Sequence, residues 1–128
     1  MKVNVWVVEW QMACCGDPFS VGSEVSWTLA PADRKWLTQA LGEETAATIE
    51  WVEEHHDEPT PDYITVEGQV TGISQIYVRY EYALNERDPH PAGGVLVPVH
   101  STHGVDRPSD LGRDFSCIGW VATLDVPS

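Results

Sequence analysis

The sequence has 128 residues, of which 42% are hydrophobic, and it contains six tryptophans. This length and apolar content are typical of one folded domain, so we expect residues 1–128 to form a single domain and not a disordered chain. Seven basic residues against twenty acidic ones give a formal net charge of -13, which argues against direct binding to nucleic acid or to an anionic membrane, because both require cationic surfaces.

The amino-terminal part of the chain predicts two strands. The run from Val3 to Trp10 is rich in β-branched and aromatic residues, which favour a strand over a helix. A tight turn is expected at 14–18, where Gly, Asp and Pro supply the backbone angles. From Glu24 to Leu29 apolar and polar residues alternate, which predicts a half-buried strand with Val25 and Trp27 on its inner face.

Between Pro31 and His56 the hydrophobic period changes to that of a helix. A first helix is predicted after Asp33, a suitable cap, and Gly42 is a natural stop signal. A second helical segment is predicted from Glu43 to about Glu54. The acidic, proline-containing tract that follows predicts a loop.

The remainder of the chain predicts four more strands. Three of them are expected at Ile64–Val70, Gln75–Leu84 and Gly94–His100, with a hairpin turn at Thr71-Gly72 between the first two. Residues 85–93 and 100–114 predict loops. The last strand, Ser116–Val126, carries an alternating apolar face made of Ile118, Trp120, Ala122, Leu124 and Val126.

Six short strands with one helical insertion predict a mainly β fold. We expect a small, partly open antiparallel barrel or sandwich of about six strands, because short strands joined by short turns rarely stay flat. The alternative is an open α+β sheet. No segment approaches the ~20 apolar residues of a membrane helix, and the amino terminus has the pattern of a strand and not of a leader, so we expect a cytoplasmic protein.

The first turn carries a distinctive motif. Its residues W-Q-M-A-C-C-G-D-P-F, at 10–19, precede a V-G-S-E-V-S-W strand entry, and a His-His pair precedes a later strand. This pattern resembles a family of short uncharacterised proteins found mainly in actinomycete bacteria, which share a W-Q-x-x-C-C-G-x-P-F signature. The resemblance covers about two-thirds of the chain and fades after about Tyr82. It implies a compact domain and brings no activity with it.

Cys14, Cys15, His55 and His56 offer the thiolate and imidazole ligands that zinc prefers. Adjacent cysteines on an extended chain point to opposite sides, so the spacing differs from that of a standard site. The alternative is that one cysteine packs under the turn, and Cys117 is expected in the core. His100 and His103 form a further H-x-x-H pair in a loop, where exposed histidines are the simpler interpretation.

The chain contains none of the common motifs for a nucleophile elbow, a phosphate-binding loop or a zinc protease, so we do not favour an enzyme. Tyr80 and Tyr82 lie at strand spacing beside Arg79 and predict an aromatic surface for a ligand or partner; the alternative is ordinary cross-strand packing.

Three functions remain open from the sequence. The favoured hypothesis is a non-catalytic binding or regulatory module that holds a protein partner. The second is a small zinc-binding protein that uses the two cysteines of the first turn and the His-His pair. The third is an acidic mimic of nucleic acid that inhibits a DNA- or RNA-binding protein, with carboxylates at 43–44, 53–54 and 57–58 along one side. The partner and the oligomeric state are not specified by the sequence.

Overall fold

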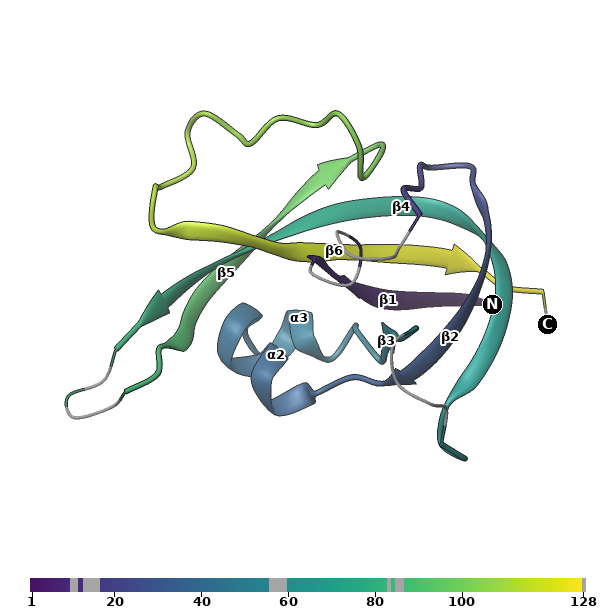
Figure 1. Ribbon diagram of the computed structural model, residues 1–128, viewed down its shortest axis with the longest axis horizontal. Coiled ribbons are helices and arrows are strands. Elements are labelled where there is room, and N and C mark those ends of the chain that lie inside the picture. The colour runs from purple at the N-terminus through teal and green to yellow at the C-terminus, as the bar shows by residue number, and fades with distance from the viewer. Residues whose placement is uncertain (10–11, 13–16, 56–59, 83, 85–86, 128) are drawn as a thin grey trace.

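The computed structural model describes residues 1–9, 12, 17–55, 60–82, 84 and 87–127. Six strands form one sheet: β1 (Lys2–Val8), β2 (Glu24–Pro31), β3 (Trp51–Glu53), β4 (Ile64–Glu81), β5 (His90–Val99) and β6 (Phe115–Asp125). Two short helices, α2 (Arg34–Leu41) and α3 (Glu43–Ala46), lie among these described residues. The predicted mainly β fold is therefore confirmed (Figure 1).

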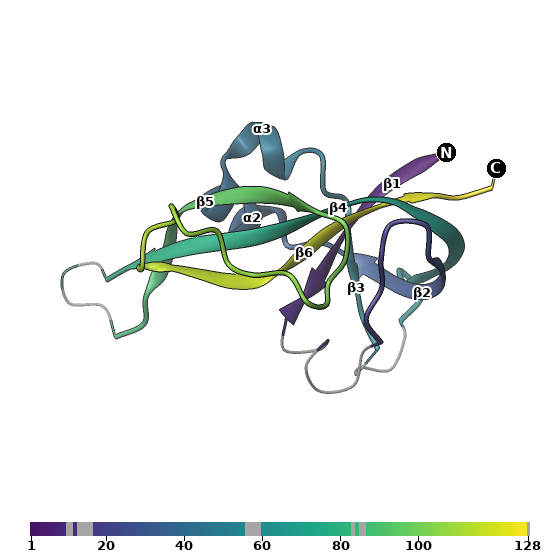
Figure 2. The same ribbon diagram turned by 90° about the horizontal axis from the view of Figure 1, so that it is seen from above.

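The strands follow the order β2-β3-β1-β6-β4-β5, and β2 also pairs with β4. That last pairing closes a ring of backbone hydrogen bonds through five strands, while β5 extends the sheet on the outer side of β4. All pairings are antiparallel except β1–β3, so the sheet is mixed and not wholly antiparallel. The two chain ends meet at one side of the ring, where the Met1 amino group donates to the Val126 carbonyl oxygen at 3.0 Å (Figure 2).

The fold contains two apolar clusters, one on each face of the sheet. Inside the ring, Val5, Leu29, Val70, Ala122 and Leu124 are essentially inaccessible to solvent. On the opposite face, α2 and α3 cover the sheet, as Figure 2 shows. There Leu37, Ala40 and Ile49 pack on Ile76, Val78 and Val121. Because strand side chains alternate between faces, β4 and β6 contribute to both clusters.

The helix α2 begins and ends where the sequence predicts. The Asp33 carboxylate accepts a hydrogen bond from the Trp36 backbone N–H at 3.0 Å, as expected of an N-cap residue. Gly42 ends the helix with a φ of 88°, a conformation that glycine adopts without steric cost. This cap fixes the position of Trp36, which contributes to a surface groove described below.

The predicted second helix, from Glu43 to about Glu54, is wrong in its second half. Only Glu43–Ala46 is helical, and Trp51–Glu53 forms β3 between β1 and β2. Trp51 and Val52 are residues that favour strands, and pairing on both sides satisfies their backbone groups. A strand of three residues is too short to show a hydrophobic period in the sequence. The helical pattern that precedes it therefore predicts a longer helix than the structure contains.

The predicted hairpin at Thr71-Gly72 is also wrong, because Ile64–Glu81 is one continuous strand. Its first part pairs with β2, and its later part lies between β6 and β5. A change of register between Val70 and Gly72 marks an irregularity there. The glycine thus bends a long strand at the point where it passes from one set of partner strands to another. Local sequence does not distinguish such a bend from a turn.

A second irregularity lies near the start of β6 and divides its apolar face. The β4–β6 register shifts between Ile76 and Tyr77, next to Gly119, whose φ is 139°. Trp120, Ala122 and Leu124 face the ring interior, whereas Ile118 packs with the cluster under the helices. The prediction that Ile118 shares their face is therefore wrong, because the extra residue reverses the alternation.

Candidate functional site

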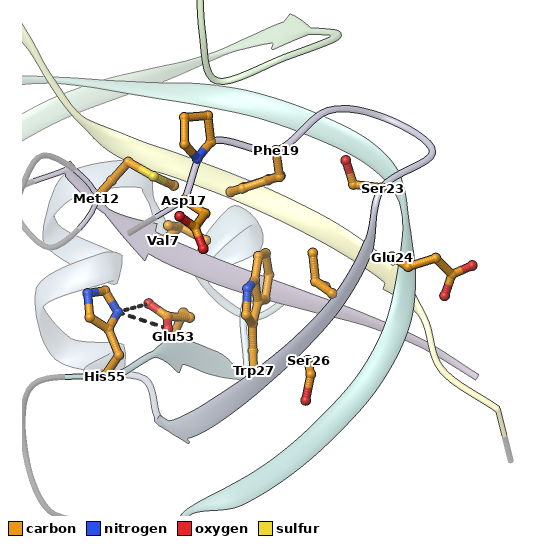
Figure 3. A pocket seen from close by; sticks show the side chains of 12 residues that line it. Val7, Met12, Asp17, Phe19, Ser23, Glu24, Ser26, Trp27, Glu53 and His55 are labelled. Carbon is orange, nitrogen blue, oxygen red and sulfur yellow. Dashed lines mark hydrogen bonds and ion pairs between the residues drawn. The ribbon is translucent and has the colours of Figure 1, made fainter. Parts of the chain in front are cut away.

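A pocket of about 420 Å³ lies where the segment before β2 crosses the end of β1 and β3 (Figure 3). Its walls include apolar side chains and carboxylates together, a composition typical of small-ligand sites. The residues that define its chemistry are Met12, Asp17, Phe19, Trp27, Glu53 and His55. We call it the Glu53 pocket.

Glu53 is the buried charge of this pocket, with 7% of its surface exposed. It lies on β3, directly opposite Leu29 of β2, so the two side chains project from the same face of the sheet. The Nδ1 atom of His55 lies 2.8 Å and 3.0 Å from the two carboxylate oxygens. A carboxylate oxygen accepts from an imidazole N–H, so in this contact the Nδ1–H of His55 donates to Glu53.

Trp27 and Phe19 form the aromatic wall. Their ring centroids are 5.0 Å apart at 71°, an edge-to-face contact that holds both rings in place. In Figure 3 the Trp27 ring lies on one side of the Glu53 carboxylate, and His55 lies on the other. A ligand group in this pocket therefore meets an aromatic face and a buried negative charge together.

The segment that carries Phe19 is tied to the distant loop after β5. The Phe19 N–H donates to the Thr102 hydroxyl at 3.1 Å, and the Thr102 N–H donates to the Phe19 carbonyl oxygen at 3.0 Å. The Ser20 and Ser101 side chains hydrogen-bond at 3.0 Å beside them. The predicted 100–114 loop therefore positions one wall of the pocket, while His103 within it is exposed.

Carboxylates outnumber basic groups at this pocket. Asp17 and Glu24 also line it, although Figure 3 shows the Glu24 side chain directed away from His55. Low access to water strengthens the electrostatic effect of Glu53 relative to a surface carboxylate. The pocket is thus suited to a group that is positively charged and has an apolar part.

The predicted zinc ligands fall only partly within the described structure. Cys14, Cys15 and His56 lie outside the described residues, whereas His55 lines the Glu53 pocket. In the part of the chain that is described, no cluster of three or more potential metal ligands occurs. Met12 and Asp17, which flank the two cysteines in sequence, both line the pocket.

Of the residues predicted to form an aromatic surface, Tyr80 and Arg79 project from opposite faces of the sheet. Tyr80 lines a second groove with Trp6 and Trp36, and Tyr82 lies just beyond β4 with 69% of its surface exposed. Arg79 alternates with Tyr80 and points the other way, where it donates to the Ala92 carbonyl oxygen at 3.0 Å and pairs with the Glu81 carboxylate. Structural contacts therefore occupy Arg79.

Two other expectations need correction. Cys117 is only partly buried and lines the same groove as Tyr80, so it is not a core residue. Glu53, which the sequence suggested for an exposed acidic face, is buried. Its separation of two residues from His55 carries a signal, because residues at i and i+2 of an extended chain project to the same side. The helical pattern of the preceding residues conceals this signal in the sequence.

Comparison with known proteins gives one match. Residues 1–126 match the model of a family described as a family of unknown function (DUF6578). The match therefore includes the carboxy-terminal third, which the motif resemblance did not reach. No curated protein and no solved structure matches the chain. Within the described residues, neither helix has the length and apolar character needed to cross a membrane.

Proposed function

We propose that this chain, which belongs to the DUF6578 family, is a binding module that holds a basic side chain of a protein partner in the Glu53 pocket. The observation that supports this function is a buried carboxylate beside an aromatic wall: Glu53 is 7% exposed, and Trp27 lines the same pocket. A carboxylate with little access to water interacts more strongly with a cation than a carboxylate on the open surface does.

Arginine is the side chain whose chemistry fits best. Its guanidinium group stacks on aromatic faces and donates several hydrogen bonds in one plane, and it is less strongly hydrated than an ammonium group. Both oxygens of the Glu53 carboxylate already contact His55, so a ligand guanidinium would share this carboxylate with the imidazole ring. The net charge of -13 favours encounter with a basic partner and makes association fastest at low salt.

A matched pair of peptides tests the proposal. Acetyl-Gly-Arg-Gly-amide and its citrulline counterpart have nearly the same shape, and only the first is charged. We expect the arginine peptide to shift the indole N–H resonance of Trp27 in a saturable manner, with at least fivefold weaker binding by the citrulline peptide. Glu53→Gln should remove most of this difference, whereas Glu44→Gln, an equal change of charge on exposed α3, should not.

Equal binding of the two peptides, or an unchanged preference in Glu53→Gln, would refute the assignment of the pocket to a cation. Asp17→Asn provides a second variant if Glu53→Gln does not fold, because Asp17 is exposed and lines the same pocket. It should weaken arginine binding to a smaller extent, since an exposed charge is better screened than a buried one.

Zinc binding is a second candidate, favoured by the pairing of Glu53 with His55. A carboxylate that accepts from Nδ1–H orients a histidine for metal binding through Nε2, as in many zinc sites. The remaining ligands would come from Cys14, Cys15 and His56, as the sequence predicts. Elemental analysis of protein purified without a metal-affinity tag should then show about one equivalent of zinc, and less than one-tenth would dismiss this candidate.

A further inference from the structure

A second concave site lies on the opposite side of β1 from the Glu53 pocket. It is a groove of about 290 Å³ between β1, α2, β4 and β6, and we call it the aromatic groove. The side chains that determine its chemistry are Trp6, Glu9, Trp36, Tyr80, Cys117 and Ile118. Its size is near the lower end for ligand pockets, which suits one small chemical group.

Three aromatic rings come from three different elements. Trp6 of β1 and Trp36 of α2 are stacked, with centroids 5.1 Å apart and planes 9° from parallel. Tyr80 of β4 lines the same groove, with 37% of its surface exposed. The Asp33 cap and the strand pairing of Trp6 with Val121 and Val52 hold the stacked pair in place. The two tryptophan rings therefore have a fixed position, and Tyr80 completes the aromatic lining of the groove.

One carboxylate gives this apolar surface its charge. Glu9 lines the groove directly after β1 and is exposed. Burial is the main reason why the pKa of the Cys117 thiol is raised; the negative charge of Glu9 also raises this pKa, whereas a backbone hydrogen bond at Gly119 and the charge of Arg107 lower it. The field of Glu9 therefore reaches the groove, while the Arg107 guanidinium lies over the Tyr77 ring, 5.4 Å from its centroid.

We propose that the aromatic groove binds an alkylated ammonium cation, such as a trimethylammonium group. Aromatic faces attract such cations, and quaternary ammonium groups are recognised by combinations of aromatic rings. Their methyl groups also pack favourably against an apolar wall. A primary ammonium group is compact and strongly hydrated, so its transfer from water to these rings is less favourable. Glu9 supplies the opposite charge at the groove.

Choline and its neutral isostere 3,3-dimethyl-1-butanol provide the test, because they share a shape and differ in charge. We expect choline to shift the indole N–H resonance of Trp36 in the full chain and to bind at least fivefold more tightly than the alcohol. Tyr80→Ala should weaken choline binding about fivefold, and Glu9→Gln should reduce the difference between the two ligands. Tyr82→Ala is the matched control, because it removes the same ring from an exposed position that does not line the groove.

Equal affinities for choline and the alcohol would show a merely apolar groove and overturn the proposal, as would no binding of either ligand. A trimethyl-lysine peptide distinguishes the two sources of the cation: tighter binding than choline identifies a modified protein, and weaker binding identifies a free metabolite. The arginine peptide should not compete with choline, because the two sites have separate linings, so failure at the Glu53 pocket and failure at the aromatic groove are separable.

Discussion

Gly119→Ala is expected to destabilise the protein severely, because no side chain fits at this position. A Cβ atom there would overlap the Val7 carbonyl oxygen and lie 3.1 Å from the Glu9 backbone nitrogen. Val7 and Val8 pair with Trp120 and Gly119, so relief of this overlap requires β1 to move away from β6. The φ of 139° adds strain of its own for any residue with a Cβ atom.

The expected loss can be estimated from these two contributions. A non-glycine residue in such a conformation costs roughly 1–3 kcal/mol. Weakening of one or two adjacent strand hydrogen bonds adds about 1 kcal/mol each. The sum, about 3 kcal/mol or more, is a large part of the ~5–15 kcal/mol that stabilises a typical domain. The melting temperature should fall by roughly 10 °C.

Urea denaturation of the variant and of Gly72→Ala measures this effect against a matched control. The nearest atoms to a Cβ atom at Gly72 would be those of Thr123, 3.9 Å away and at ordinary van der Waals distance. Gly72 also lies at an irregularity of the sheet but has no positive φ, so the two variants differ in steric conflict and in backbone strain. A Gly119→Ala loss within 1 kcal/mol of the Gly72→Ala loss would refute the reasoning.

Two further predictions concern pH and helix capping. Burial raises the pKa values of the Cys117 thiol and the Tyr77 phenol above their ordinary values, so the unfolded chain ionises first. The free energy of unfolding should therefore fall as the pH rises above about 9. Urea denaturation at several pH values from about 7 to 11 measures this fall, which should be smaller in the double variant Cys117→Ala/Tyr77→Phe. Asp33→Ala should cost about 1 kcal/mol in the same assay, because the Trp36 N–H loses its acceptor, whereas Asp33→Ser should retain most of the stability.

The strands near both ends of the chain, β2 among them, were predictable because their alternation of apolar and polar residues is long enough to recognise. Val25 and Trp27 pack against the ring interior, as their spacing indicated. By contrast, the three residues of β3 form a strand only because β1 and β2 lie on either side. The bend near Gly72 likewise depends on a change of partner strands, which is tertiary information.

The site was less predictable than the fold because it combines distant segments. His55 was identified as a candidate, but its partner Glu53 was assigned to an acidic surface. Trp6 and Trp36 are 30 positions apart, and their stacking depends on how α2 packs against β1. Tyr80 was identified from strand spacing, whereas its aromatic neighbours required the structure. Local sequence patterns therefore identify single candidate site residues but do not show which of them lie together in the fold.

The shortness of β3 has a consequence for solvent access. In β3, only Trp51 and Val52 pair with β1, and only three residues pair with β2. Few backbone hydrogen bonds therefore join β3 to either neighbour. Amide hydrogens in β3 should exchange by transient local separation, well before those in the middle of the 18-residue strand β4, which has long pairings with β5 and β6. Each such event exposes Glu53 while the remaining strands stay paired, which gives a ligand a route to a carboxylate that is otherwise buried.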